Sequence, residues 1–341
     1  MGSLPSFQFH RPETLEGACE ILEECAGRAR VLAGGTDLLV MMKQQVVQPS
    51  VVVFIKHLQS LRGVRKEEDE TWRIGPGMTL HEVETDPGVR RRFAPLAEAA
   101  GRVASLQVRH MATLGGNVCL DTKCWYLNQS WMLRRACLPC LREGGEGCTA
   151  VPGGDRCYAL FSADTVPALL ALGAQIKLTG ARGSRRLSLE DLYTGDGHHP
   201  YTLKPGEILS DIYLSQPEGP WGGVYLKHGH PTDVEFAVVG VAVVLGLDEG
   251  REGVRWARVR MGALESRPLN GEECESILRE GPIEADRIRR AARAAAREIH
   301  PAFGYRATVG YKKRVTETVV ERAIHTALER AGAKVNGQAA G

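Results

Sequence analysis

Hydrophobic and polar positions follow two different patterns in the first third of the chain. Extended segments are predicted at 6–10, 29–32, 50–55 and 72–80, and helices are predicted from Thr14 onward, over 37–45 and over 96–105. Thr14, followed by Glu16 and Glu20, is typical of a helix start. Two glycine turns, at 33–36 and 113–117, punctuate this region. The pattern therefore predicts a mixed α and β domain.

The pattern breaks between residues 119 and 158. This stretch holds six of the nine cysteines, many glycines and polar residues, and no clean period of 2 or 3.6. A long irregular loop inside a compact domain is uncommon unless it has a function. We therefore expect a functional insert here.

Regular patterning returns after the insert. A helix followed by a strand is predicted over 163–179. Beyond residue 183 the sequence predicts a separate unit with short strands at 207–214, 223–227 and 254–261, an apolar helix over 236–245, and amphipathic helices from Ile283 and Thr316. No internal repeat of fixed period is present.

Composition narrows the classes of protein that fit. With 341 residues, 43% of them hydrophobic, the chain is long enough for two or three domains with sizeable cores. A formal charge of +2 lacks the concentrated basic field of a nucleic-acid-binding protein. The longest apolar run, 236–247, is shorter than the roughly 20 residues that cross a bilayer, and the first residues lack a secretory pattern. We expect a cytoplasmic protein without membrane or nucleic-acid partners, in which clustered cysteines favour metal binding or catalysis over disulfides.

The two glycine turns have the chemistry of a phosphate site. Glycines such as Gly34, Gly35, Gly115 and Gly116 let the backbone approach a ligand, and successive amides of such a turn bind anions. Either pair alone could simply close a turn after a strand. Together, with Asp164 further along, they predict one dinucleotide site. Neither has the G-x-G-x-x-G spacing, so a Rossmann-type NAD site is not indicated.

The insert has the chemistry of a metal site. Four of its thiolates could ligate a 4Fe-4S cluster or zinc, and free or redox-active thiols are a third interpretation. Structural zinc sites usually show two short C-x2-C knuckles, whereas only Cys137 and Cys140 have that spacing. The residues therefore favour a cluster. Cys19, Cys25 and Cys274 lie in helix-like stretches and are interpreted as small buried hydrophobes.

Three motifs carry a resemblance to a known family. AGGTDLL (33–39), ATLGGN (112–117) and SADTVPALLAL (162–172) resemble the FAD-binding medium subunits of the molybdenum hydroxylases, the group of xanthine dehydrogenase and aerobic carbon monoxide dehydrogenase. Segments 207–214, 223–243 and 305–323 resemble that family's C-terminal domain.

The resemblance implies an α+β fold. It consists of a two-lobed FAD-binding domain of the vanillyl alcohol oxidase (PCMH) type with a cysteine-rich insert, followed by a smaller α+β domain. The implied ranges are 1–60 for lobe 1, 61–182 for lobe 2 with the iron-sulfur insert at 119–158, 183–330 for the C-terminal domain of the CO dehydrogenase flavoprotein type, and 331–341 for a flexible tail.

The same resemblance implies how FAD is held. The two glycine turns would bind the pyrophosphate and ribityl groups, Asp164 would fix a polar edge, and Leu209 and Lys227 would border the isoalloxazine. A cation at 227 would stabilise an anionic reduced ring; a solvated surface lysine is the alternative. The expected cofactor-binding residues are Val31, Leu32, Ala33, Gly34, Gly35, Thr36, Asp37, Leu38, Val103, Thr113, Leu114, Gly115, Gly116, Asn117, Asp164, Leu209 and Lys227.

The insert narrows the resemblance further. GGNVCLDTKCWYLNQSWM, CLPCL, GEGC and DRCYA are similar to the flavin subunits of 4-hydroxybenzoyl-CoA reductases, which bear an extra 4Fe-4S cluster at this place. The resemblance implies Cys124, Cys140, Cys148 and Cys157 as ligands. Cys119 and Cys137 would be spare, with Cys137 as the rival of Cys140.

The implied role is that of an oxidoreductase subunit without a catalytic residue of its own. Electrons would pass from ferredoxin through the 4Fe-4S cluster and FAD to 2Fe-2S and molybdenum centres, for reductive dehydroxylation of an aryl-CoA. The implied partners are a molybdopterin-binding large subunit and a 2Fe-2S small subunit, in a dimer of heterotrimers. Two alternatives remain: the flavin subunit of another molybdenum hydroxylase with outward electron flow, and a non-catalytic flavin- or zinc-binding module.

Overall fold

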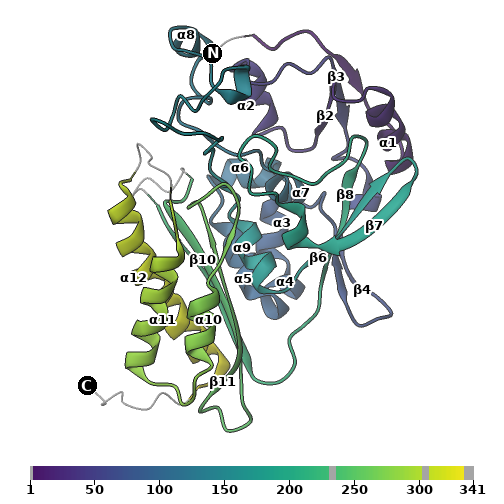
Figure 1. Cartoon of the computed structure of the whole chain (residues 1–341). Coiled ribbons are helices and arrows are strands. Elements are labelled where there is room, and N and C mark those ends of the chain that lie inside the picture. Colours follow the sequence, from purple (N-terminus) through teal and green to yellow (C-terminus); the bar gives the residue numbers. More distant parts are fainter. Residues whose placement is uncertain (1–2, 230–235, 302–306, 334–341) are drawn as a thin grey trace.

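The computed structural model describes residues 3–229, 236–301 and 307–333. These residues form three sheets, with strand orders β1-β3-β2, β4-β5-β8-β6-β7 and β12-β11-β10-β9. Each sheet has helices packed against it (Figure 1). The first and third sheets each come from one stretch of the chain, whereas the second combines β4 and β5 with β6, β7 and β8, which follow the insert. Within the described ranges, no helix has the length and apolar character needed to traverse a bilayer. The cytoplasmic location stays a prediction.

The first sheet is parallel. Strand β3 (Val51–Phe54) lies between β1 (Gln8–His10) and β2 (Ala29–Leu32). Helix α1 (Leu15–Glu24) connects β1 to β2, and α2 (Leu38–Lys43) connects β2 to β3. Thr14 caps α1 by accepting a hydrogen bond from the amide of Gly17 at 3.1 Å, as the sequence predicts. Burial of Cys19 on α1 agrees with its interpretation as a small hydrophobe.

The second sheet is antiparallel, and most helices that precede residue 215 pack beside it. Its strands are β4 (Val64–Lys66), β5 (Trp72–Ile74), β6 (Gln175–Gly180), β7 (Gly183–Ser188) and β8 (Ile208–Leu214). The helices are α3 (Leu80–Thr85), α4 (Pro87–Arg92), α5 (Ala94–Gly101), α6 (Leu106–Met111), α7 (Leu114–Val118) and α9 (Thr165–Ala171). Short 3-10 helices lie at Gln59–Leu61, Leu141–Glu143 and Leu189–Leu192.

The predicted strand over 72–80 is wrong in its second half. Strand β5 ends at Ile74, and Thr79 begins α3. The Thr79 hydroxyl accepts from the amide of Glu82, whose carboxylate accepts from the amide of Thr79. This capping box satisfies the first amides of α3 and so favours a helix over continuation of the strand.

The third sheet forms the C-terminal domain. Its strands are β9 (Trp221–His228), β10 (Val239–Leu247), β11 (Val254–Gly262) and β12 (Leu269–Asn270), and its helices are α10 (Glu272–Leu278), α11 (Ala285–Glu298) and α12 (Val309–Ala331). The helices cover one face of this sheet (Figure 1).

The predicted apolar helix over 236–245 is wrong, because β10 occupies this stretch as a central strand. All nine of its residues are buried. Val241 and Val243 pack with the helices of the C-terminal domain, whereas Ala242 and Val244 pack into the core of the second sheet. A strand buried on both faces has a continuous apolar run, which periodicity alone does not distinguish from a buried helix.

The domain boundary expected at residue 183 does not coincide with a break in the second sheet. Strand β7 pairs with β6, and β8 pairs with both β5 and β6. We therefore propose a boundary between β8 and β9, at residues 215–220. Helix α12 extends through Ala331, and the rest of the expected tail, from residue 334, lies outside the described residues.

The insert is mostly irregular, as predicted, but it is anchored at two places. An isolated bridge between Lys123 and Leu160 closes its base. Its one α-helix, α8 (Trp131–Arg135), lies against the end of α2, where the buried guanidinium of Arg134 donates to the carbonyls of Gln44 at 3.0 Å and Gln45 at 3.2 Å. The insert is therefore fixed to lobe 1.

Replacing Arg134 with Met should release the insert, because the change leaves several buried carbonyls without a donor. Each unsatisfied group costs about 1–3 kcal/mol. We expect a lower free energy of unfolding and faster proteolytic cleavage within residues 119–158. The exposed neighbour Arg135, changed to Met, is the matched control. Equal cleavage rates in the two variants would contradict the anchoring role.

Candidate functional site

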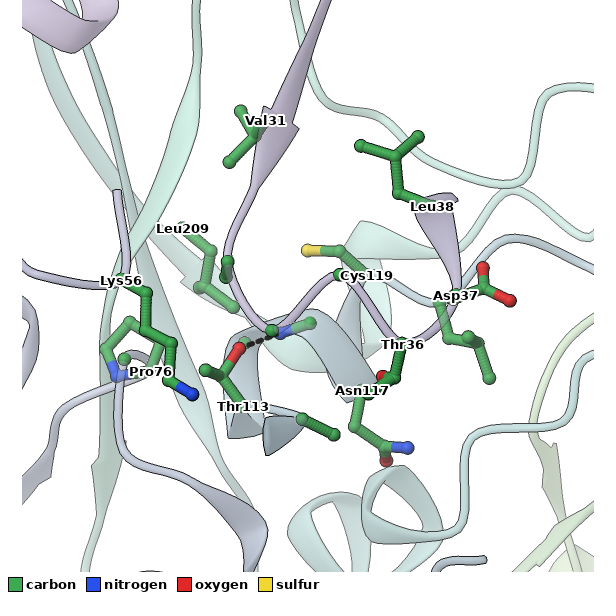
Figure 2. Close-up of a pocket in the computed structure, with 18 of the residues that line it drawn as sticks. Val31, Thr36, Asp37, Leu38, Lys56, Pro76, Thr113, Asn117, Cys119 and Leu209 are labelled. Carbon is green, nitrogen blue, oxygen red and sulfur yellow. Dashed lines mark hydrogen bonds between the residues drawn. The ribbon is translucent and has the colours of Figure 1, made fainter. Parts of the chain in front are cut away.

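A cavity of about 390 Å³ lies between the first and second sheets. The β2–α2 turn and the start of α7 line it (Figure 2). The segment near Val103 lines it as well. The two glycine segments thus face one another across a common space, as the sequence predicts. Of the expected cofactor-binding residues, those that line the cavity are Val31, Ala33, Gly34, Gly35, Thr36, Asp37, Leu38, Val103, Thr113, Gly115, Gly116, Asn117, Asp164 and Leu209.

Three expected residues do not line the cavity. Leu32 is the last residue of β2, directly before the cavity-lining turn. Leu114 is fully buried in the core of the second sheet. Lys227 lies behind Asp164. All three were predicted to bind the cofactor because they adjoin lining residues, either along the chain or in space.

The first glycine turn requires glycine for two different reasons. A Cβ on Gly34 would lie 2.3 Å from the carbonyl oxygen of Met111, so the turn touches the backbone at the end of α6. Gly35 has φ +72°, a left-handed conformation that strains other residues. The turn can therefore approach the end of α6, two residues before the second glycine segment, only with glycine at position 34.

The second glycine segment is the start of a short helix rather than a turn. Thr113 caps α7 by accepting from the amide of Gly116 at 3.1 Å (Figure 2). A Cβ on Gly115 would lie 2.8 Å from that of Pro76. The oxygen of the Asn117 side chain accepts from the amide of Thr165 at 3.1 Å, which ties α7 to α9. The expected free turn is thus replaced by a capped helical turn with its glycines packed tightly.

Asp164 is the buried acid of the cavity wall. One of its oxygens accepts from the hydroxyl of Tyr225 at 2.7 Å, and the other accepts from Nζ of Lys227 at 2.9 Å. Burial raises the pKa of Asp164, against the opposing effect of the Lys227 ammonium and the Tyr225 hydrogen bond. Two donors therefore orient this carboxylate.

The structure decides against one of the two interpretations of Lys227, and its position beside the isoalloxazine stays a prediction. Its side chain is only 7% exposed, so it is not a solvated surface lysine. Its ammonium donates to Asp164 and to the carbonyl of Arg102 at 2.9 Å, and the residue does not line the cavity. The charge of Lys227 acts on the cavity through Asp164.

The sequence did not indicate Tyr225, which contacts the wall through Asp164, or fifteen of the residues that line the cavity, Lys56 among them. Tyr225 lies two positions before Lys227 on β9, so both side chains share one face of the strand, and this alternation was the available signal. Lys56 lines the cavity with no motif around it. Its ammonium donates to the carbonyl of Met111 at 2.9 Å, and burial lowers its pKa. Figure 2 shows Lys56 and Asn117 on opposite sides of Thr113.

Comparison with known proteins agrees with this geometry. The family model of the FAD binding domain in molybdopterin dehydrogenase matches residues 5–217, and that of the CO dehydrogenase flavoprotein C-terminal domain matches residues 225–327. The chain belongs to the FAD-binding subunits of the molybdenum hydroxylases. The gap between the two matches, 218–224, overlaps the end of the boundary proposed above from the sheets.

Relatives cover nearly the whole chain. The carbon monoxide dehydrogenase medium chain of Afipia carboxidovorans is 26% identical over 327 residues, 96% of this chain and 98% of that one. The nicotinate dehydrogenase FAD-subunit of Eubacterium barkeri is 25% identical over 322 residues, 94% and 95%. A crystal structure of the Cu,Mo-CO dehydrogenase, in a cyanide-inactivated form, superposes with a TM-score of 0.78 at 25% identity, covering 96% of this chain and 99% of that one. The assignment to the vanillyl alcohol oxidase type stays a prediction.

The residues around the cavity fit FAD. The side-chain-free backbone at Gly34 and Gly35, the capped start of α7 and the ammonium of Lys56 suit an anionic pyrophosphate. Leu209 and Val103 offer apolar surface for a ring system. This donor set is the one expected of a FAD-binding subunit.

A second, smaller cavity lies inside the insert. Its lining includes Cys124, Cys140, Cys148 and Cys157, the four expected ligands. Cys119 instead lines the larger cavity. Cys137 is exposed, and it lines neither of these two cavities. The structure thus brings together, around one cavity, the four cysteines that the resemblance implies as ligands.

The thiols are not arranged around a metal position in this structure. Burial raises the pKa values of Cys124 and Cys157, as expected of protonated thiols in an apolar cavity. Among the described residues, no group of three or more His, Cys, Asp or Glu side chains could hold a metal ion as placed. The cavity is also small, about 20 Å³. A cluster would therefore require the loop to expand around it.

Replacing Gly34 with Ala should remove most of the bound FAD, because its Cβ would push the first turn away from Met111. The measurement is flavin absorbance per protein after gel filtration. Gly250→Ala is the control, since a Cβ there meets only a carboxylate oxygen of Asp248 at 3.7 Å. Full flavin content in Gly34→Ala would contradict the close-approach argument.

Replacing Asp164 with Asn should lower the free energy of unfolding by about 3 kcal/mol, because it leaves the buried ammonium of Lys227 without its carboxylate. Chemical denaturation of the apoprotein measures this. The double variant Asp164→Asn with Lys227→Met should regain part of the loss, since no charge remains buried. Additive losses in the double variant would show that the pair does not act as a unit.

Proposed function

We propose that this FAD-binding subunit also carries a 4Fe-4S cluster and serves a 4-hydroxybenzoyl-CoA reductase-like complex. The observation that supports the extra cluster is the convergence of Cys124, Cys140, Cys148 and Cys157 on one cavity. These are the four cysteines that the resemblance of the insert assigns as ligands. In this interpretation electrons enter from a low-potential donor such as ferredoxin.

Burial and position support the proposed choice of ligands over spares. A cluster needs four thiolates that can reach one position, and four cysteines share a cavity. Cys137 is the rival of Cys140 by spacing, yet Cys140 is buried in that cavity while Cys137 is exposed. Because zinc also accepts four cysteines, iron, zinc and acid-labile sulfide analysis must decide between a 4Fe-4S cluster and a zinc ion.

The two cofactor sites lie close along the chain. Cys119 lines the larger cavity and Cys124 lines the smaller one. Five residues span at most about 18 Å when fully extended. The ion pair between Lys123 and Asp37 holds the intervening segment against the first glycine turn. This short, anchored connection supports electron transfer between the two sites.

The chain's own residues bind, position and insulate the cofactors. When bound, FAD and the cluster supply the electron-carrying chemistry. Asp164, with its two donors, would orient a polar edge of the flavin. We propose a molybdopterin-binding large subunit and a 2Fe-2S small subunit as partners, in a dimer of heterotrimers, for dehydroxylation of 4-hydroxybenzoyl-CoA.

A second candidate is the flavin subunit of a molybdenum hydroxylase with outward electron flow. Its support is the match over nearly full length to subunits of nicotinate and carbon monoxide dehydrogenases. Identifying the co-purifying subunits and assaying the complex with 4-hydroxybenzoyl-CoA and a reduced ferredoxin distinguishes the two. No reduction of the aryl-CoA by an otherwise active complex would eliminate the first candidate.

Changing any one of Cys124, Cys140, Cys148 and Cys157 to Ser should remove about one cluster's worth of iron, because each thiolate bonds to iron. FAD should remain, since its cavity is lined by other residues. Anaerobic purification followed by iron, acid-labile sulfide and flavin analysis measures both cofactors.

Cys137→Ser is the control for this series, because Cys137 is exposed and should keep the iron in place. Zinc without acid-labile sulfide in the unmodified protein would refute the cluster and support a zinc-binding module. Iron loss in Cys137→Ser with retention in Cys140→Ser would shift the ligand within the C-x2-C pair.

A further inference from the structure

A third cavity, of about 220 Å³, lies where the end of the insert meets the C-terminal domain. Its walls come from residues 156–160, from the turn at 194–195 and from the turn at 265–267 that follows β11, with His300 beside them. The third cavity shares no lining residue with the flavin cavity and only Tyr158 with the cysteine cavity. It is therefore a separate space, to which neither cofactor is assigned.

The lining of the third cavity carries more positive than negative charge. Arg156 and Arg267 line it, and His300 adds a positive charge when it is protonated. Among the described residues of the lining, Glu265 is the one acidic side chain. Neither arginine forms an ion pair with a carboxylate that the structure describes, and the guanidinium of Arg156 lies 5.1 Å from the centre of the Tyr158 ring. The cavity therefore favours an anion.

Two further carboxylates lie close to the third cavity without neutralising it. Asp155 and Asp196 adjoin lining residues along the chain, but neither lines the cavity. Asp155 accepts from the hydroxyl of Tyr158 at 3.1 Å, and Asp196 accepts from the amide of His198 at 2.8 Å. These hydrogen bonds hold both carboxylates without an arginine. The guanidinium donors of the cavity thus remain available to a ligand.

Glu265 holds the walls of the third cavity in position. Its carbonyl accepts from the amide of Phe161 at 2.9 Å, and its Oε1 accepts from the amide of His300 at 2.8 Å. Gly195 has φ +82°, and a Cβ there would lie 3.2 Å from Cδ of Arg267, so glycine lets this arginine lie against the turn. Because the walls are already joined, a ligand would bind with little loss of conformational entropy.

We propose that the third cavity binds the phosphate group of a small, hydroxyl-bearing phosphate monoester. Arginine presents planar, paired donors that match phosphate oxygens, and Arg156, Arg267 and His300 would share one dianion. Oε2 of Glu265, which accepts no hydrogen bond from a described residue, would accept one from a hydroxyl of the ester. The proposal goes beyond the proposed function and does not depend on the cluster.

The size and charge of the third cavity favour this ligand over three others. A dinucleotide such as FAD is expected in the cavity of about 390 Å³, and the third cavity is little more than half as large. A cation would meet Arg156 and Arg267, and like charges repel. A free phosphate ion would meet the carboxylate of Glu265, whereas an ester places a hydroxyl donor there.

The test is calorimetric titration of the purified, flavin-loaded complex with glycerol 3-phosphate. Arg156→Gln and Arg267→Gln should each weaken its binding about ten-fold, as loss of a charge-assisted donor does. Flavin and iron contents should not change. Arg255→Gln is the matched control, because Arg255 is exposed on β11 and lines none of the three cavities. The affinity of the unmodified complex should fall as salt rises.

Inorganic phosphate and glycerol are the comparison probes, and Glu265→Gln is the diagnostic variant. Both probes should bind more weakly than glycerol 3-phosphate to the unmodified complex. Glu265→Gln should raise the affinity for inorganic phosphate several-fold, because it removes a like charge and keeps an acceptor oxygen. A variant that merely disturbed the walls would lower that affinity instead.

The remaining outcomes would each overturn the proposal. No binding of glycerol 3-phosphate to the unmodified complex would do so, as would binding of glycerol with equal affinity. Unchanged affinity in both arginine variants would show that the ligand lies elsewhere. Equal affinities for inorganic phosphate and glycerol 3-phosphate would show a site for the free ion and refute the monoester.

Discussion

The close approach of two backbone segments is the constraint on which the flavin cavity depends. The first glycine turn belongs to lobe 1, and the carbonyl of Met111 that it meets belongs to the helices of the second sheet. The ammonium of Lys56 binds the same carbonyl. Because backbone meets backbone here, no rotamer change can widen or narrow the contact. The spacing between the lobes, and with it the space for a pyrophosphate, is set by the main chain.

Buried charged side chains hold the cavity wall and the insert in place. Asp164 holds the ammonium of Lys227 behind the cavity wall, and Arg134 holds the insert against α2. Each charge has several hydrogen-bond partners, which offset the cost of removing it from water. The apolar core fixes where the sheets lie, while these polar contacts fix which groups face the two cavities. Function in this fold therefore depends on a small number of satisfied ions at the edges of the core.

Sequence patterns identified local chemistry better than they identified packing. The glycine turns were found because close approach demands glycine, and fourteen of the expected flavin residues line one cavity. The four cysteines that the resemblance implies line another cavity, and their role as ligands stays a prediction. The helix expected over 236–245 failed because burial on both faces of β10 erases the period of a strand. Lys56 was missed because its role arises only from a contact with Met111, 55 residues away. Such contacts are properties of the tertiary fold and leave no mark on neighbouring residues.

The paired base of the insert bears on how such a loop could enter or leave the fold. Lys123 and Leu160 are bridge partners, so the two ends of the loop are already adjacent. A long loop between fixed ends costs only slightly more closure entropy than a short one, about 0.6 kcal/mol for each doubling of its length. Thirty-odd residues could thus be gained or lost in evolution without disturbing the sheets. The insert and its cysteine-lined cavity could be acquired as a single cassette, and a chimaera joined at this bridge would be a rational way to transplant them.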